Sequence, residues 1–411
     1  MSENYQLILN CRICKSSKLQ SIINLGEQPL ANSLLNDAKT SEITVPLELI
    51  RCDNCTTVQL SVNVSPEIMF NEYYWVTGTT KTAMDHLESL AKSLQAKIAK
   101  NKPRLLEVGC NDGSLLKVLQ KNSFGELIGV DPAKNIIDQI NSKDLQLFTN
   151  FFNLEFAKNF TDNYEPVDFV VARNVFSHVP DVVQCLEAVS MILNEDGIFV
   201  MEFHEATKIL NEIHYDSIYH EHTFYHSIRS ISEAASLVGL YPFDIETSPI
   251  SGGSFIVYFD RKIRDKTANL IDHEKTEIDS GVLTLDKWKT FAELALLNIE
   301  EIRKYLQFNS TKKICGFGAS ARSSTLMNAV GSKFKTLIGI ADNNPIKNKK
   351  YSPGLHLLID KPMEIIDKST EIIILFPFNF EDEILDYLRK ELKWSGEVFI
   401  PLPSIPRIIK I

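Results

Sequence analysis

Short apolar runs, separated by stretches with helical spacing, dominate the middle of the chain. Four of them mark expected strands, at residues 104–108, 127–130, 167–172 and 197–202. Strands that alternate with helices at this spacing form parallel sheets. Two later runs, at 241–246 and 255–259, would add a hairpin to the same sheet. The pattern therefore predicts an α/β domain with a mainly parallel sheet.

The pattern changes on both sides of this domain. The first 80 residues contain short segments and turns, and Val58–Val64 is their clearest alternating strand. Residues 263–308 carry many charges with apolar side chains at helical spacing, which predicts a helical connector. After residue 308 the alternation of strand, glycine turn and helix resumes, which indicates a second Rossmann-like domain. The expected parts are an N-terminal module, a central domain, the connector and a C-terminal domain, at 1–80, 81–262, 263–308 and 309–411.

The chain has 411 residues and a formal net charge of -10. At about 100 to 200 residues per domain, this length agrees with two or three domains. The acidic balance disfavours nucleic acid as a partner. No apolar run is long enough for a membrane span, and the first residues lack the features of a signal peptide. We expect a cytoplasmic protein, monomeric or weakly dimeric, that binds neither nucleic acid nor membranes.

Four of the seven cysteines form two CxxC pairs near the N-terminus. The pairs are Cys11-Arg-Ile-Cys14 and Cys52-Asp-Asn-Cys55. Each pair presents two thiolates to one point, which is typical of a tetrahedral zinc site. Four thiolates leave no open position, so the expected zinc is structural. No aromatic and basic surface surrounds the pairs, which argues against a nucleic-acid finger.

A glycine-rich turn follows the first strand of the central domain. Gly109 and Gly113 lie in this turn, where the missing side chains let a ligand approach the start of the next helix. Asp131 ends the following strand, where a carboxylate can accept both ribose hydroxyls of a nucleoside. Glu107 would attract a cationic amino-acid group and repel a pyrophosphate. These residues favour S-adenosylmethionine over a nicotinamide dinucleotide as the cofactor.

Four of the nine histidines lie between His214 and His226, which we call the histidine segment. Histidine is the usual proton-transfer group near neutral pH, and Tyr219, Glu221 and Tyr225 are possible partners for His222. A second metal site on His220 and His222 is the alternative. His178 follows the third strand of the sheet, so it should lie at the carboxyl edge where such sheets bind ligands.

A second glycine turn, Gly316-Phe-Gly-Ala-Ser320, opens the C-terminal domain. Asp342 ends the next strand, and Lys347, Lys349 and Lys350 follow it. This arrangement suits a nucleotide whose diphosphate meets the lysines. A scaffold fold with a solvated lysine face is the alternative.

Taken together, these motifs resemble the S-adenosylmethionine-dependent C-methyltransferases that act on nucleotide-linked deoxysugars. The resemblance extends over essentially the whole chain. It rests on the CxxC pairs and on further motifs in the same order: Gly26-Glu-Gln-Pro-Leu-Ala31, Glu107-Val-Gly-Cys-Asn-Asp-Gly113, Tyr219-His-Glu-His222, Gly252-Gly253, Gly316-Phe-Gly-Ala-Ser320 and Pro353-Gly354.

The resemblance implies a zinc-binding N-terminal region, a central S-adenosylmethionine domain and a C-terminal domain that helps to bind the nucleotide-sugar. It also implies a reaction at C3, the carbon next to the C4 keto group, in which His222 removes a proton. Glu221 and Tyr219 would assist, His178 would polarise the ketone, and Tyr74 in a lid at 71–80 would face the site.

The same resemblance supplies the remaining candidate residues. The cofactor would also contact Asn111, Pro132, Asn150, Phe151 and Asn174. The nucleoside-diphosphate-linked keto-deoxysugar would contact Ser251, Gly252, Gly253, Gly318, Ala319, Asp342 and Lys347. Asn150 stands where the family often has an aspartate, and this difference affects the contact with adenine. Ser251 stands where the family often has a histidine, and this difference affects the sugar pocket.

Three other functions fit parts of the pattern. An O- or N-methyltransferase would use the same cofactor and need no ketone. A nicotinamide-dependent oxidoreductase would use the turn at Gly316. A zinc-stapled scaffold would have no activity.

Overall fold

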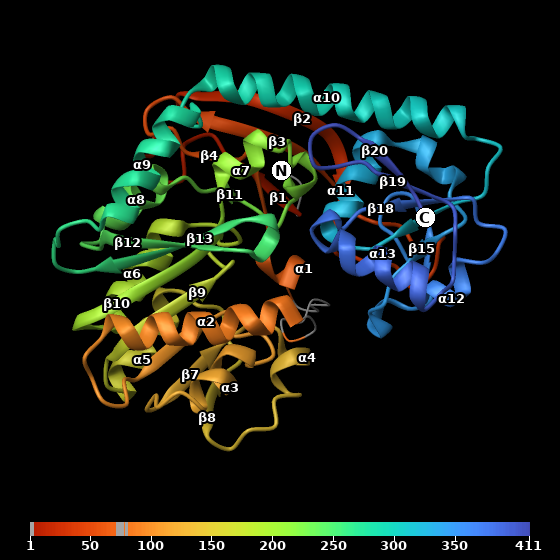
Figure 1. Cartoon of the computed structure of the whole chain (residues 1–411). Helices are drawn as coiled ribbons and strands as arrows, with labels where there is room; N and C mark the ends of the chain where they lie inside the picture. Colours follow the sequence, from red (N-terminus) through yellow and green to blue (C-terminus); the bar gives the residue numbers. More distant parts are fainter. Residues whose placement is uncertain (1–3, 71–77, 79–80) are drawn as a thin grey trace.

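The computed structural model describes residues 4–70, 78 and 81–411 of the chain. The chain forms three parts, each built on a β-sheet. A long helix extends along one side of the molecule (Figure 1). The predicted class, an α/β protein with a zinc-binding module and two Rossmann-like domains, is confirmed. None of the described helices combines the length and the apolar character that a membrane crossing needs.

The N-terminal module contains a four-stranded antiparallel sheet in the order β11-β4-β3-β2. Its strands are β2 (Leu19–Pro29), β3 (Thr44–Cys52), β4 (Val58–Leu60) and β11 (Phe224–Tyr225). A ribbon of β1 (Tyr5–Leu7) and β5 (Val62–Val64) lies beside it, followed by α1 (Pro66–Phe70). The strand expected over 58–64 is therefore divided at Ser61. The fourth strand, β11, belongs to the histidine segment, so this segment is part of the module's sheet.

The central domain has a seven-stranded sheet in the order β12-β13-β10-β9-β6-β7-β8. The strands are β6 (Leu105–Val108), β7 (Leu127–Val130), β8 (Leu145–Phe148), β9 (Val167–Arg173), β10 (Leu193–His204), β12 (Tyr241–Ser248) and β13 (Ser254–Asp260). All neighbours among the first five pair in parallel, and the last two form the expected hairpin at the edge. Only β8 had no predicted counterpart.

Helices cover both faces of this sheet. One face packs against α2 (Lys81–Lys97) and α3 (Ser114–Gln120). The other packs against α5 (Leu154–Asn163), α6 (Val182–Ile192) and α8 (Ile228–Ser236). The short helices α4 (Lys134–Ile137), α7 (Ala206–Asn211), η2 (Tyr215–Ser217) and η3 (Ile250–Gly252) lie in the connections. The carboxyl ends of the parallel strands, where ligands bind in such folds, remain between the three parts.

The predicted connector is helical, with α9 (Ala268–Ser280) and α10 (Leu285–Phe308). The C-terminal sheet has the order β16-β17-β15-β14-β18-β19-β20. Its strands are β14 (Ile314–Phe317), β15 (Ile340–Ala341), β16 (Lys350–Tyr351), β17 (Leu358–Asp360), β18 (Ile372–Leu375), β19 (Glu397–Ile400) and β20 (Arg407–Lys410). Its helices are α11 (Ala321–Val330), η4 (Ser332–Thr336), η5 (Pro345–Lys347), α12 (Pro362–Ile365), η6 (Phe378–Phe380) and α13 (Glu381–Lys390).

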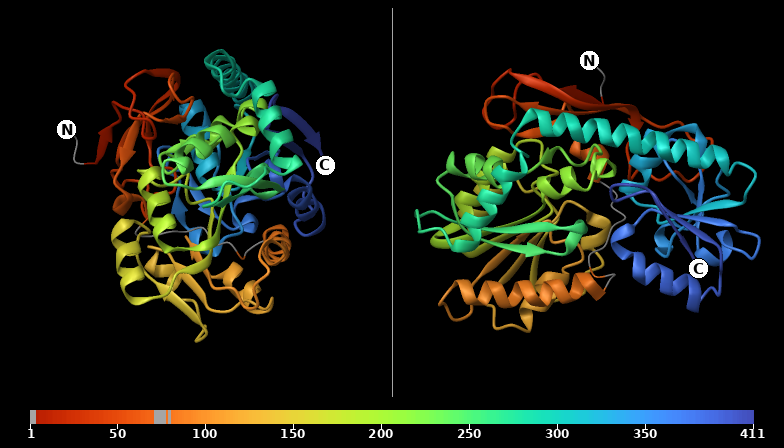
Figure 2. Two further views of the ribbon diagram at one scale, coloured as in Figure 1. Left: turned by 90° about the vertical axis from the view of Figure 1, so that its left-hand side faces the viewer. Right: turned by 45° about the horizontal axis from the view of Figure 1, so that its top comes forward.

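Helix α10 joins the three parts into one body. It lies along the central and C-terminal domains, with β2 and β3 beside it (Figure 2). Trp288, Phe291 and Ile302 on its inner face belong to a hydrophobic core that also includes residues of all three parts. The buried Asn298 accepts a hydrogen bond from the hydroxyl of Tyr215 at 2.9 Å and donates to the Pro401 carbonyl at 3.0 Å. The parts therefore share apolar and polar contacts in the interior.

A buried ion pair adds a charged contact between domains. In η2, Asp216 is almost fully buried, and Arg322 at the start of α11 reaches it from the C-terminal domain. Arg322 Nε donates to one carboxylate oxygen at 2.8 Å, and Nη2 donates to the other at 2.9 Å. The guanidinium also lies over the ring of Phe378, 4.8 Å from its centroid. Such a two-point contact fixes orientation as well as distance.

We expect Arg322→Ala to destabilise the packed domains by about 3 to 5 kcal/mol, because it leaves the carboxylate of Asp216 buried without a counter-charge. The matched control is Arg229→Ala, since Arg229 pairs with Glu233 on the surface of α8, where a loss of about 0.5 kcal/mol or less is expected. Thermal unfolding of both variants measures the difference. Equal midpoints would show that the buried pair does not hold the domains.

Candidate active site

Four cysteine thiols meet in the N-terminal module, as predicted. All four sulfur atoms of Cys11, Cys14, Cys52 and Cys55 lie within 4.8 Å of one another. The Cys11–Cys55 and Cys14–Cys52 sulfur distances are both 3.5 Å. This spacing and the all-thiolate donor set fit one tetrahedral zinc ion with no open position. Zinc therefore has a structural role here.

The two CxxC turns have the same local shape. In each, the residue after the second cysteine is left-handed, with φ of 60° at Lys15 and 59° at Thr56. Arg12 lies inside the first turn and donates to the carbonyls of Leu60 and Val62, both at 2.7 Å. The first turn is thus tied to the strands β4 and β5 that follow the second turn. Zinc and Arg12 together close the module around its small core.

The glycine turn at the end of β6 is shaped for a ligand. Gly109 and Gly113 have φ of 66° and 68°, in the left-handed region that favours glycine. A Cβ at Gly109 would come within 2.5 Å of the Val175 side chain, so any residue with a side chain would clash at this position. Asp131 ends β7 beside this turn. Its carboxylate accepts from the backbone N–H groups of Asn111 and Ala133, both at 2.9 Å.

Residues with charged side chains surround the predicted amino-acid end of the cofactor. Glu107 is fully buried, and Arg173 from β9 lies 3.3 Å from one of its oxygens. Burial raises the pKa of Glu107 to about 7, although Arg173 opposes the shift. Its second oxygen has no hydrogen-bond partner among the described residues. This orphaned acceptor fits the ammonium group of S-adenosylmethionine.

The sequence did not indicate a second buried acid at the same edge. Glu202, near the end of β10, lies 3.0 Å from the His86 ring on α2. Ser248 donates to the same oxygen of Glu202 at 2.5 Å. Glu202 is opposite Arg173 in the paired strands, so the two acids flank one guanidinium. Only the shared register of β6, β9 and β10 brings these residues together, and no local motif marks them.

The other predicted cofactor residues also lie at the carboxyl edge. Pro132 follows Asp131, and Asn150 and Phe151 follow the end of β8. Asn174 follows β9 in a left-handed conformation, with φ of 54°. Its backbone N–H donates to the carbonyl of Glu202 at 2.8 Å. All four positions follow the ends of parallel strands of this sheet, and their contacts with the cofactor remain predictions.

In the histidine segment, the imidazole of His222 is held at both nitrogens. Nδ1 lies 3.0 Å from the backbone oxygen of Ser217, and this contact requires an N–H at Nδ1. Nε2 is then free to accept, and it lies 2.7 Å from the hydroxyl of Tyr219. Burial, with the nearby His178 as a further cause, lowers the pKa of His222 well below its usual value. The ring is therefore neutral at physiological pH and carries its lone pair at Nε2.

His178 and His222 lie together, as the sequence suggested. Their ring centroids are 4.9 Å apart, and the planes are almost perpendicular. Burial lowers the pKa of His178 to about 4. The segments that carry the two histidines are joined by Thr223, which follows His222. Its N–H donates to the backbone oxygen of Ser177, which precedes His178, at 2.7 Å. Tyr74, the last predicted member of this group, lies outside the described residues, as does most of the lid expected at 71–80.

Glu221 does not face His222, although the two are neighbours in sequence. Its carboxylate accepts from the side-chain amide of Asn32 in the N-terminal module, at 2.7 Å. His220 lies against the carbonyls of Val45 and Pro46, at 3.2 and 3.3 Å. The cysteine group is the one cluster of metal-ligating side chains found in the described part of the chain. The alternative of a second metal site on His220 and His222 therefore has no support.

The glycines that follow β12 lie between domains. Ser251 and Gly252 belong to η3, and Gly252 and Gly253 have φ of 84° and 133°. A Cβ at Gly252 would meet the rings of His214 and Phe378 at 3.8 and 3.9 Å. The predicted substrate loop thus faces the junction of the central and C-terminal domains.

The second glycine turn repeats the geometry of the first. Gly318 is left-handed, and the carboxylate of Asp342 accepts from the N–H groups of Ala319 and Asn344, both at 2.8 Å. The difference is Lys347, whose ammonium lies 3.1 Å from Asp342 and donates to Ala319 O at 2.7 Å. The lysine expected to meet a diphosphate is instead bound inside the turn.

Three family models match consecutive parts of the chain. One described as "Putative zinc binding domain" matches residues 11–70, "Methyltransferase domain" matches 81–243, and "C-methyltransferase C-terminal domain" matches 249–403. Over 419 residues the chain is 26% identical to C-methyltransferase NovU of Streptomyces niveus, covering 100% of this chain and 99% of that protein. It is 28% identical over 103 residues to the mitochondrial arginine-hydroxylase NDUFAF5 of Homo sapiens, covering 25% and 29%.

Solved structures of methyltransferases are similar to less than half of the chain. Magnesium protoporphyrin IX methyltransferase from Synechocystis has a TM-score of 0.33 at 13% identity and covers 44% of this chain and 79% of its own. A TehB-like S-adenosylmethionine-dependent methyltransferase from Corynebacterium glutamicum has a TM-score of 0.33 at 16% identity, with coverage of 43% and 88%.

Fold and site define an S-adenosylmethionine-dependent methyltransferase with a structural zinc site. The order of the three matched models and the full-length similarity to NovU are more specific. Together they show an S-adenosylmethionine-dependent C-methyltransferase.

We expect Asp131→Ala to weaken binding of S-adenosylhomocysteine by about 10-fold or more, because a buried carboxylate can no longer accept from the ribose hydroxyls. Asp342→Ala is the matched control, since it removes the equivalent carboxylate from the second turn. Calorimetric titration of both variants gives the affinities. Equal losses would contradict the assignment of the cofactor to the first turn.

Proposed function

We propose that this enzyme methylates a carbon, at C3, next to the C4 keto group of a nucleoside-diphosphate-linked 4-keto-deoxysugar. His222 acts as the base in this proposal. Its support is the tautomer set by Ser217 O, which makes Nε2 the basic nitrogen of the ring, with the hydroxyl of Tyr219 beside it. The similarity to C-methyltransferases supports the type of reaction. The sugar substrate is proposed from the motifs that resemble those of the nucleotide-sugar C-methyltransferases.

The proposed step begins with proton transfer. Nε2 of His222 takes the proton from the carbon beside the ketone, and the electrons of that C–H bond move into the enolate. Tyr219, 2.7 Å from Nε2, orients the ring and can relay the proton. His178, with its ring near that of His222, donates to the enolate oxygen. Bound S-adenosylmethionine supplies the electrophilic methyl group that the enolate carbon receives.

Residues around the cofactor turn keep the reactants aligned. The pair of Glu107 and Arg173 fixes one acid under the turn, and Asp131 is held by two backbone N–H groups. Held geometry of this kind lowers the barrier because the two reacting carbons need not find each other in solution.

The alternative functions have less support. An O- or N-methyltransferase needs no base for a C–H bond, whereas His222 presents a buried, unprotonated Nε2 that can act as one. A nicotinamide-dependent oxidoreductase would need the second turn, but there Lys347 already binds the carboxylate of Asp342. The C-methyltransferase match argues against an inactive scaffold.

We expect His222→Ala to reduce methyl transfer to nucleoside-diphosphate 4-keto-sugars by about 100-fold or more, the usual range for a lost general base. Binding of S-adenosylhomocysteine should be unchanged. With S-adenosylhomocysteine bound and no methyl donor, the wild type should exchange solvent deuterium at the carbon beside the ketone, followed by NMR. The variant should not.

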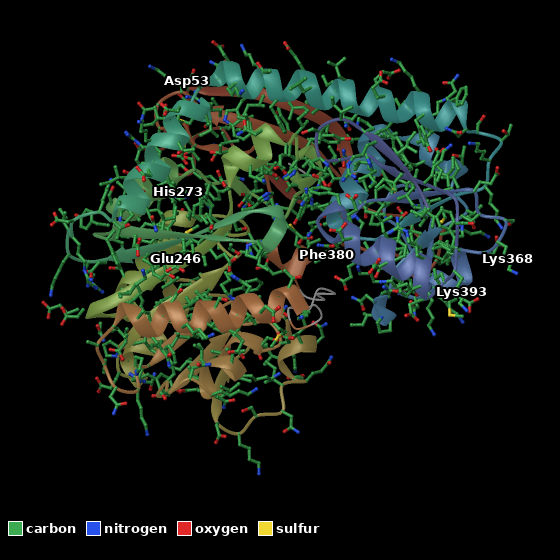
Figure 3. All side chains as sticks on the ribbon, viewed as in Figure 1. Asp53, Glu246, His273, Lys368, Phe380 and Lys393 are labelled. Atoms are coloured by element: carbon green, nitrogen blue, oxygen red, sulfur yellow. The ribbon has the colours of Figure 1, made fainter. Side chains whose placement is uncertain are left out.

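His273→Ala is the matched control, since His273 lies on α9, away from the C-terminal domain (Figure 3). It should retain both activities. Methyl transfer by the wild type without deuterium exchange would instead favour an O- or N-methyltransferase, and normal turnover of His222→Ala would refute the base.

The pH profile of turnover tests the state of the same ring. A base must be unprotonated, and burial puts the pKa of His222 well below 6.5, so the ring stays competent as the pH falls through that value. We expect kcat to be flat from pH 8 to 6.5 and to fall only in more acidic solution. An inflection at or above pH 6.5 that His222→Ala abolishes would contradict a depressed pKa.

A further inference from the structure

A cavity lies between the N-terminal module and the histidine segment. Its volume is about 590 Å³, and its lining includes Leu30, Asn32, Glu67, Met69, His220 and Glu221. The lining residues come from three segments of the chain, at residues 30–34, 67–69 and 220–221. The cavity adjoins the proposed base, because His222 directly follows Glu221 in the chain.

The polar wall of the cavity is built around one carboxylate. Glu221 is 5% exposed, and its Oε1 accepts from Asn32 Nδ2 at 2.7 Å. Its Oε2 has no hydrogen-bond partner among the described residues. Burial raises the pKa of Glu221 to about 7, although the bond from Asn32 opposes this shift. An orphaned acceptor at the wall of a cavity is costly unless a ligand supplies the donor.

The charge of the lining selects the kind of group that can enter. Glu67 and Glu221 are acidic, and no lysine or arginine is among the described lining residues. Burial lowers the pKa of His220 to about 4, so this ring is neutral. A diphosphate would therefore be repelled, whereas a hydroxyl or ammonium group would find an acceptor.

The segment that carries Asn32 is fixed at its far end by the C-terminal domain. Leu35 pairs with Tyr351 through two backbone hydrogen bonds of 2.9 and 2.8 Å. Asn36 accepts from the Lys350 ammonium at 2.8 Å. On the other side of the cavity, β11 holds the histidine segment to β4 of the module. The distance between Asn32 and Glu221 is thus set by contacts outside the cavity.

We propose that Asn32 is a positioning residue. Its amide holds Glu221 so that the carboxylate accepts a hydrogen bond from a hydroxyl or ammonium group on the substrate sugar, next to the reacting carbon. This inference rests on the proposed function, since it takes the ligand to be the keto-sugar. It gives the zinc-binding module a direct part in substrate recognition.

The test compares KM and kcat of full-length variants with a nucleoside-diphosphate 4-keto-sugar. Asn32→Ala should raise KM by about 10-fold or more, because a hydrogen bond to a charged acceptor is lost, and change kcat less. Lys39→Ala, at an exposed position on the same segment, is the matched control and should leave both constants unchanged. Unaltered zinc content and S-adenosylhomocysteine binding show that each variant is folded.

An analogue that lacks the donor separates recognition from a structural effect. With a keto-sugar that has hydrogen in place of the hydroxyl or amino group, Asn32→Ala and the wild type should have the same KM. Glu221→Gln, which keeps the shape of the side chain, should repeat the pattern. An unchanged KM in Asn32→Ala, or an equal penalty with both sugars, would overturn the inference. If the wild type methylates no keto-sugar, the proposed function itself fails.

Discussion

The ion pair between Arg322 and Asp216 is the contact on which the geometry of the candidate site depends. A carboxylate buried as deeply as that of Asp216 is stable only beside a matched cation, and the guanidinium meets both of its oxygens. The requirement fixes the C-terminal domain against the histidine segment. The next residue, Ser217, accepts from His222 through its backbone oxygen, so the orientation of the imidazole follows from the same contact.

Every other part of the chain adds an anchor to the histidine segment. The connector contributes Asn298, which accepts from Tyr215, and the central domain contributes the carbonyl of Ser177, which accepts from Thr223. The N-terminal module pairs β4 with β11. In the described part of the chain, the core that this module forms by itself has only five buried residues, so a closed zinc site is a direct way to make the module rigid enough for that role.

Local chemistry explains what could be predicted from the sequence. Apolar runs located the strands β6, β7, β9 and β10, and the CxxC spacing located the zinc ligands, because both signals are complete within a few residues. Contacts between distant segments leave no such signal. Asn32 and Glu221 are 189 residues apart, and adjacency to His222 suggested a partnership that does not form, because residues 219–222 make a turn and Glu221 bonds to Asn32 instead. The pairing of Glu202 with His86 was missed for the same reason.

The two glycine turns show why a motif does not by itself assign a ligand. In both, an aspartate at the end of the next strand accepts from two backbone N–H groups, so the backbone geometry is shared. The first turn leaves the remaining lone pairs of Asp131 for a ribose. In the second, the ammonium of Lys347 meets both Asp342 and the carbonyl of Ala319. A nucleoside at the second turn would have to displace this partly buried cation, so the shared backbone geometry does not by itself assign the same ligand to both turns.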